Sequence, residues 1–107
     1  MKGPVDARVH VRFLTTAEGG REKAVDAPAY GYRPTARIDG KYFDFRVATV
    51  GRMELGDAYD VDIAFLDIEN AKPHLGIGVG FCIWEGKDVG TGVVLELIDR
   101  DDPSSSD

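Results

Sequence analysis

The chain has 107 residues, of which 43% are hydrophobic and 30% charged, and its formal net charge is −6. These values are typical of a single globular domain, and the negative charge opposes non-specific binding to nucleic-acid phosphates. The sequence shows neither an apolar run of membrane-spanning length nor a secretory signal, so we expect a cytoplasmic location and no membrane partner.

Composition divides the chain into a domain at residues 1–98 and a tail at residues 99–107. The tail reads DRDDPSSSD, and such an acidic, Ser-rich segment has too few apolar side chains to bury. We therefore expect the tail to be disordered.

The first expected strand spans residues 6–14 and alternates with the two-residue period of a half-buried strand. Its apolar face consists of Ala7, Val9, Val11 and Phe13. Residues 15–28 break the pattern with a Gly-Gly pair and five charges, which predicts a long surface loop. Pro34 limits strand pairing in the next segment, residues 30–39, so we place that segment at a barrel edge or corner.

Asp39-Gly40 predicts a two-residue type I′ turn, in which both central positions have positive φ. A strand is expected after it, at residues 41–47, with Phe43, Phe45 and Val47 on one face. A short segment at 51–57 ends in a Gly-Asp turn, and a further strand is expected at 58–66. Its inward residues are Tyr59, Val61, Ile63 and Phe65, and its outward residues are Asp60, Asp62 and Ala64.

The longest pattern is a β-hairpin at residues 74–97 with a turn at 85–88. The expected apolar face comprises Ile77, Val79, Phe81 and Ile83 before the turn, and Val89, Thr91, Val93, Leu95 and Leu97 after it. Gly76, Gly78 and Gly80 would share the other face of the first strand, where missing side chains let a strand bend sharply.

Strands at this spacing predict a sandwich or a barrel, and the glycines favour a barrel. We count six or seven strands and essentially no helix, with residues 67–73 as a simple connection. The expected fold class is all-β, a small closed antiparallel β-barrel of about six strands.

Three local patterns follow one another along the chain. They are Glu18-Gly19-Gly20-Arg21, then Gly31-Tyr32-Arg33-Pro34, and finally Phe81-Cys82-Ile83-Trp84-Glu85-Gly86 followed by Val89-Gly90-Thr91-Gly92-Val93-Val94. Taken in this order, they resemble the C-terminal (third) β-barrel domain of translation elongation factor Tu. The resemblance covers residues 6–98.

The resemblance implies a six-stranded barrel that, in this family, contacts tRNA, the exchange factor Ts and the family's own GTPase domain. The family's tRNA-facing glutamate falls on Glu85. Three positions depart from the family pattern: Glu22 replaces a histidine, Thr35 a glutamine and Trp84 an arginine. The lost donors and added negative charge favour a protein partner over tRNA.

Seven residues are candidates for partner binding: Arg21, Tyr30, Tyr32, Arg33, Trp84, Glu85 and Lys87. The three cations could form a rim for a phosphate or an acidic partner, or they could be solvated or paired with loop glutamates. For Arg33, between Tyr32 and Pro34, the favoured alternative is a structural role in which it holds backbone carbonyls of a tight corner. Trp84 could be an exposed binding hot spot, or it could stack over Gly90 or Gly92 across the hairpin.

Other patterns give no chemistry. Asp57, Asp60 and Asp62 do not fit a calcium loop, and His10 and His74 have no partners at zinc-ligand spacing. The Gly-rich run at 76–80 lies within an expected strand, so it is not a dinucleotide fingerprint, and Cys82 has no basic neighbour to activate it. We expect no metal and no cofactor.

The chain lacks a GxxxxGK[ST] loop, so GTP hydrolysis is not expected, and we do not expect an enzyme. We expect a non-enzymatic binding module that engages a protein, or less readily tRNA, of the translation machinery. The alternative is a structural or oligomeric accessory protein, unrelated to translation, that self-associates as a homodimer through the uncovered barrel face. A third interpretation, an enzyme or small-molecule binder with a site at a barrel mouth, is opposed by the small interior of such barrels.

Overall fold

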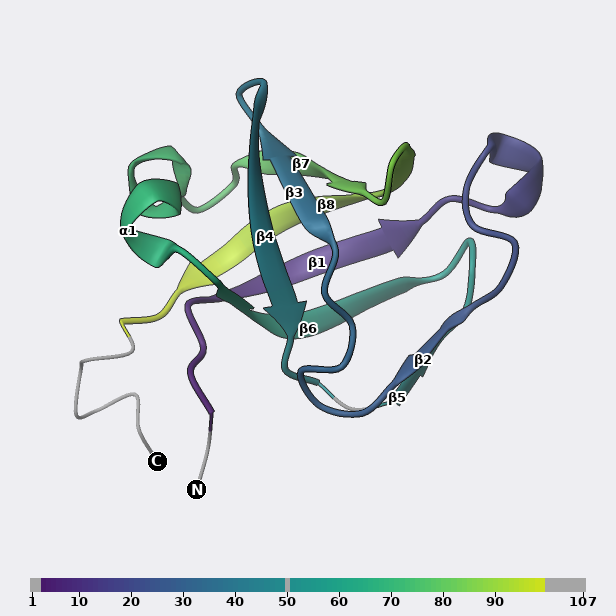
Figure 1. Cartoon of the computed structure of the whole chain (residues 1–107), viewed down its shortest axis with the longest axis horizontal. Coiled ribbons are helices and arrows are strands. Elements are labelled where there is room, and N and C mark those ends of the chain that lie inside the picture. The colour runs from purple at the N-terminus through teal and green to yellow at the C-terminus, as the bar shows by residue number, and fades with distance from the viewer. Residues whose placement is uncertain (1–2, 50, 100–107) are drawn as a thin grey trace.

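The computed structural model describes residues 3–49 and 51–99, and these form a closed antiparallel barrel with a small two-stranded ribbon beside it (Figure 1). The predicted fold class is therefore confirmed. The expected disordered tail lies, beyond Asp99, outside the described residues.

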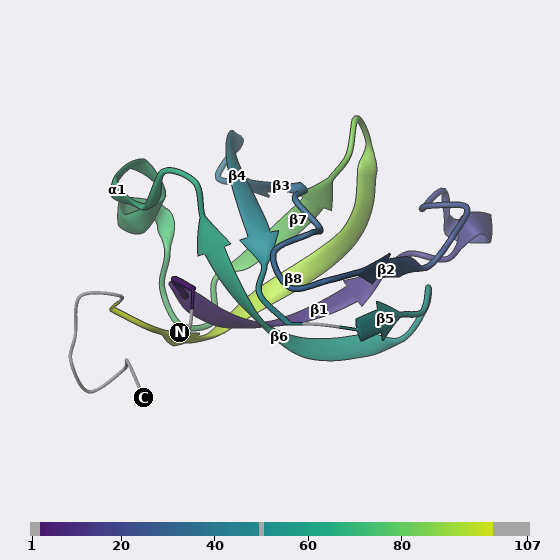
Figure 2. The ribbon, with the colours of Figure 1, turned by 60° about the horizontal axis from the view of Figure 1, so that its bottom comes forward.

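Two 3₁₀-helices, Thr16–Glu18 and Lys72–His74, are present in the described residues, together with eight strands and one short α-helix. The strands and the α-helix are β1 (Ala7–Phe13), β2 (Val25–Ala27), β3 (Thr35–Ile38), β4 (Lys41–Val47), β5 (Gly51–Met53), β6 (Ala58–Phe65), α1 (Ile68–Ala71), β7 (Gly80–Trp84) and β8 (Asp88–Leu97). The barrel order is β1-β6-β4-β3-β7-β8, and β8 returns to pair with β1. The β2–β5 ribbon lies at the opposite end of the molecule from α1 (Figure 2).

The alternation predicted for the first strand is confirmed. Ala7, Val9, Val11 and Phe13 of β1 are all buried, and β1 pairs with β6 on one side and β8 on the other. Burial of the apolar face supplies the driving force that makes this strand part of a barrel rather than a solvated ribbon.

The turn between β3 and β4 is also as predicted. Asp39 has φ 53° and Gly40 has φ 74°, so both central residues occupy the left-handed region that a type I′ turn requires. A two-residue turn fixes the register, and it sets Arg37 opposite Tyr42 and Thr35 opposite Asp44.

Aromatic rings fill the centre of the barrel. Phe45 packs against Phe65, with ring centroids 6.0 Å apart, and edge-on against Phe81, at 6.2 Å. Phe13 packs at 5.9 Å from Tyr32 near one end. Side chains therefore occupy the interior, as small barrels require.

The prediction of which β8 residues face the interior is correct for Val89 and wrong for the later ones. Val93, Leu95 and Leu97 are 40–46% exposed, and Thr91 is exposed too. The register shifts beside Trp84, which pairs with Asp88 while Ile83 pairs with Gly90, so Val89 is an extra residue. A bulge of this kind reverses the faces, and the buried residues after it are Gly90, Gly92 and Val94.

Four further expectations need correction. Residues 76–79 form a turn instead of the start of the hairpin strand, which leaves Ile77 73% exposed. Of the three glycines expected on one strand face, only Gly80 lies within β7. Residues 67–73 contain α1, because Asp67 caps the first turn by accepting from the Asn70 N–H. Ala64 is buried although it is on the outward side of β6. The described residues contain eight strands rather than six or seven, because β2 lies within the expected loop.

None of the helices described here is long and apolar enough to cross a bilayer.

Candidate functional site

Three of the predicted site residues bind one another. An Arg21 guanidinium nitrogen lies 2.6 Å from both carboxylate oxygens of Glu85, and the Tyr32 hydroxyl donates to the same carboxylate. The Arg21 guanidinium also lies over the Tyr32 ring, 5.6 Å from its centroid. We call this set the Glu85 clamp, because it ties the 15–24 loop and the segment before β3 to the β7–β8 turn.

The Glu85 clamp is partly shielded from water, since the Arg21 and Glu85 side chains are 26% and 27% exposed. Burial raises the pKa of the Tyr32 hydroxyl, and the hydrogen bond to Glu85 raises it further. Tyr32 therefore stays a proton donor throughout the physiological range. Arg21 was expected either to be free for a partner or to pair with a loop glutamate, and the structure shows the ion pair, with Glu85.

Replacing Glu85 by glutamine should destabilise the protein by about 1–2 kcal/mol, because it leaves the half-buried Arg21 without a counter-charge. Amide hydrogen exchange in residues 16–24 should accelerate, since the loop loses its tie to the barrel. Urea unfolding and exchange measurements test this. Glu22→Gln, in the same loop but exposed, is the matched control, and an equal loss in both variants would contradict a clamping role.

Trp84 belongs to a different surface, the outer face of β4, β3 and β7. Its ring meets the ring of Tyr42 edge-on at 5.2 Å, and Tyr42 is 55% exposed. Trp84 therefore packs against Tyr42 rather than over Gly90 or Gly92. Arg37, which lies between them in the sheet, is held by Asp88 at 2.7 Å. We call this surface the Trp84 face.

The remaining predicted site residues are dispersed. Arg33 lies on the Trp84 face, two residues before Thr35, which pairs with Trp84 across the sheet. The expected structural role of Arg33 is wrong, because its side chain is exposed and donates to no backbone carbonyl among residues 3–49 and 51–99. Lys87 is exposed in the β7–β8 turn. Tyr30 has φ 62°, and its hydroxyl donates to the Pro4 carbonyl at 2.7 Å, so it anchors the N-terminal segment.

Sequence reasoning missed three residues of the Trp84 face: Tyr42, Arg37 and Arg46. All three are on the outward side of strands that were expected or partly expected. The Asp39-Gly40 turn could have predicted these neighbours, because its two-residue length fixes which β3 residue faces which β4 residue.

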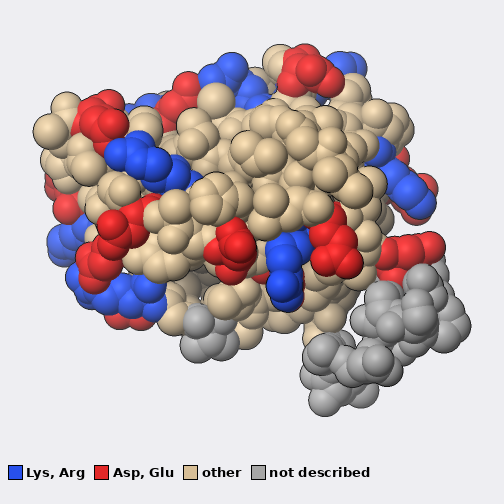
Figure 3. Space-filling model, turned by 180° about the vertical axis from the view of Figure 1, so that it is seen from behind, with Lys and Arg blue, Asp and Glu red and all other residues tan. Residues whose placement is uncertain are grey.

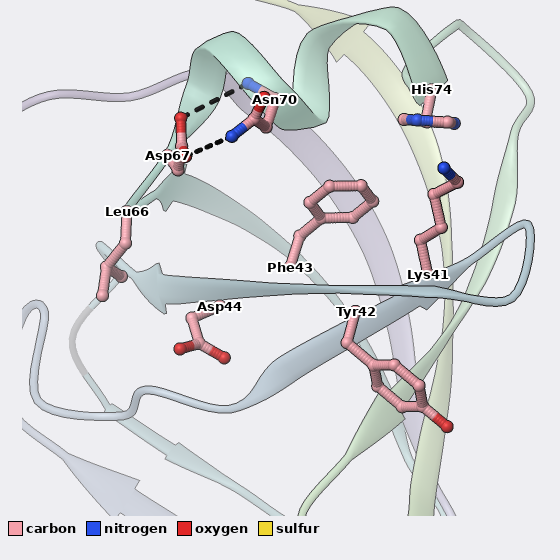
Figure 4. Close-up of a pocket in the computed structure, with 8 residues that line it drawn as sticks. All are labelled: Lys41, Tyr42, Phe43, Asp44, Leu66, Asp67, Asn70 and His74. Carbon is pink, nitrogen blue, oxygen red and sulfur yellow. Dashed lines mark hydrogen bonds between the residues drawn. The ribbon is translucent and has the colours of Figure 1, made fainter.

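A hollow of about 540 Å³ borders this face at the edge of β4 (Figure 4). Lys41 and Phe43 point from β4 toward α1 and His74, while Tyr42 and Asp44 point to the opposite side of the strand. Asp67 and Asn70 are bonded to each other, and Phe43 packs on His74 with ring centroids 5.3 Å apart. The hollow thus spans a strand edge and does not form an enclosed ligand cavity.

The outward acids of β6 bind side chains of β1. Asp60 forms a hydrogen bond with the His10 ring at 2.7 Å, and Asp62 forms an ion pair with Arg8 at 3.1 Å. Among residues 3–49 and 51–99, no group of three or more His, Cys, Asp or Glu side chains is placed to hold a metal ion.

Neither a protein-family model nor a curated protein sequence matches this chain.

Proposed function

We propose that this chain is a non-catalytic module that binds a protein partner through the Trp84 face. The observation that carries this proposal is the Trp84–Tyr42 pair, two large aromatic rings packed on the outside of a barrel whose interior is already filled. Tryptophan, tyrosine and arginine are the residues most enriched at the energetic centres of interfaces. Arginine is also present on this face, as Arg37 and Arg33.

The finer proposal is that the partner belongs to the translation machinery. The resemblance to the third domain of elongation factor Tu supports it, because that domain binds other components of translation. The net charge of −6 favours a protein partner over tRNA.

A second candidate is self-association, and a specific surface favours it. Val93, Leu95 and Leu97 of β8 are exposed, and the Gly78 N–H donates to the Val94 carbonyl at 2.8 Å, which brings exposed Ile77 beside them. We call these four residues the β8 stripe. Figure 3 shows a broad area without charged side chains on the face of the molecule opposite to that of Figure 1.

Capture from the protein's own cells tests the first candidate. Wild type should recover a partner that Trp84→Ala and Tyr42→Ala recover about thirtyfold less well, because each removes a ring from the centre of the surface. Ile77→Ala is the matched control, since it truncates an exposed apolar side chain of the β8 stripe. Circular dichroism confirms that each variant is folded.

Purified components then test the partner class. Titration with exchange factor Ts and with aminoacyl-tRNA should show binding to Ts that Trp84→Ala weakens. Binding to neither at tens of micromolar would refute the translation form of the proposal. A wild-type dimer in light scattering that Leu95→Ser dissociates, with equal recovery of proteins by wild type and Trp84→Ala, would favour self-association instead.

A further inference from the structure

Two arginines of the Trp84 face differ from the other described arginines, because they bind no carboxylate. Of the seven arginines in the described part of the chain, five bind a carboxylate. These are Arg8, Arg12, Arg21, Arg37 and Arg52. The other two, Arg33 and Arg46, have no ion pair or side-chain hydrogen bond with any residue in 3–49 or 51–99.

The two unpaired arginines are cross-strand neighbours. The Val47 N–H donates to the Tyr32 carbonyl and the Phe45 N–H to the Pro34 carbonyl, both at 3.0 Å. This register sets Arg33 directly opposite Arg46, on the side facing away from buried Pro34 and Phe45. Side chains directly opposite in antiparallel strands have Cβ atoms about 4.5–5.5 Å apart, and like charges there repel.

Arg46 also carries an unsatisfied donor. Its Nε is buried and has no hydrogen-bond partner in the structure. A buried N–H without an acceptor is costly, and such groups are rare in native proteins. Asp44, two residues earlier on the same face, does not relieve it, because that carboxylate accepts from the Thr35 hydroxyl at 2.7 Å.

We propose that Arg33 and Arg46 form an oxyanion subsite that receives a carboxylate side chain from an acidic segment of the protein partner. The outer nitrogens of the Arg33 and Arg46 guanidinium groups can bind the two oxygens of one carboxylate, which offsets the repulsion between these neighbours. A turn of the Arg46 side chain toward the ligand would also give its buried Nε–H an acceptor. The Trp84–Tyr42 pair is on the same face, so an apolar residue of the same segment can pack there. This inference rests on the proposed function and specifies the chemistry of the partner.

Nuclear magnetic resonance tests the subsite directly, because arginine Nε–H groups give their own signals. Hexaglutamate should shift the Arg46 Nε–H signal and change Trp84 fluorescence, whereas hexaglutamine should do neither. Arg33→Gln and Arg46→Gln should each weaken hexaglutamate binding about tenfold. Arg46→Lys keeps the charge and the alkyl stem but not the planar fork, so its affinity should fall between those of Arg46→Gln and wild type.

Arg52→Gln is the matched control, since Arg52 is a paired, exposed arginine on β5 in the ribbon. An equal loss of affinity in this control would mean attraction to net charge alone and would overturn the subsite. An Arg46 Nε–H signal that does not shift at millimolar hexaglutamate would also overturn the subsite. The same holds if titration of this signal shows that a short RNA binds more tightly than hexaglutamate.

The two proposals can fail separately. A captured partner that depends on Trp84 but not on Arg33 or Arg46 would leave the module standing and remove the subsite. Hexaglutamate binding at Arg46, with no Trp84-dependent partner, would leave the subsite standing and remove the module.

Discussion

Phe45→Ala is expected to lower the free energy of unfolding by about 3–5 kcal/mol, one of the two largest effects we predict. Phe45 is 1% exposed and packs against both Phe65 and Phe81, so its removal leaves a cavity that two other rings line. A closed barrel has hydrogen bonds all around its circumference and cannot collapse easily into that space. Urea denaturation measures the loss as a fall in the midpoint.

Phe43→Ala is the matched control for this prediction. Phe43 is on the same strand face two residues away but is only half-buried, where it packs against His74. Its truncation should cost clearly less. Equal losses for the two variants would contradict a core centred on Phe45.

Gly92→Ala should destabilise the protein by about 1–3 kcal/mol, although it adds a single methyl group. A Cβ at Gly92 would lie 2.3 Å from a Phe81 ring atom, and the next two nearest atoms belong to the same ring. That ring cannot simply swing aside, because it is buried edge-on against Phe45. Urea denaturation of the variant measures the cost.

Two comparisons sharpen the Gly92 prediction. Adding Phe81→Leu to Gly92→Ala should cost less than the sum of the two single changes, because a smaller side chain frees space for the methyl. Gly80→Ala, in the paired strand β7, should be nearly neutral, since its Cβ would lie 3.8 Å from the Gly92 carbonyl oxygen, which is an ordinary contact. Strict additivity, or an equal loss at Gly80, would refute the steric argument.

Much of the fold follows from local pattern. The alternation in β1 and the Asp39-Gly40 turn each specify a face or a register without help from distant residues. The inner faces of β4 and β6 were predicted for the same reason, because each apolar residue there recurs at a strict period of two.

The face of β8 could not be predicted from the same rule. Apolar residues occupy the alternating positions 89, 93, 95 and 97, and Thr91 continues the same alternation. The bulge at Val89 nevertheless turns the later residues of this series outward. A bulge depends on how two strands fit, which a single strand's sequence does not state. The inward positions are then filled by glycines and Val94, and the Phe81 ring takes the volume at Gly92.

The candidate site was predicted in part. Trp84 and Arg33 were both named as candidates, but their neighbours Tyr42 and Arg46 come from β4 and join them only through strand register. Arg21 and Glu85 were both named, yet their mutual ion pair makes them part of the scaffold. Residue type identifies candidates, whereas pairing decides which charges remain available to a partner.

The seam between β1 and β8 has a consequence for how the protein is made. Residues 7–13 leave the ribosome long before residues 90–97, which form one of their two neighbouring strands. Until that segment emerges, the nascent chain presents an unpaired edge on its first strand, and such edges invite aggregation. Closure must therefore follow synthesis of nearly the whole domain, and the long sequence separation of this contact should make the final step slow.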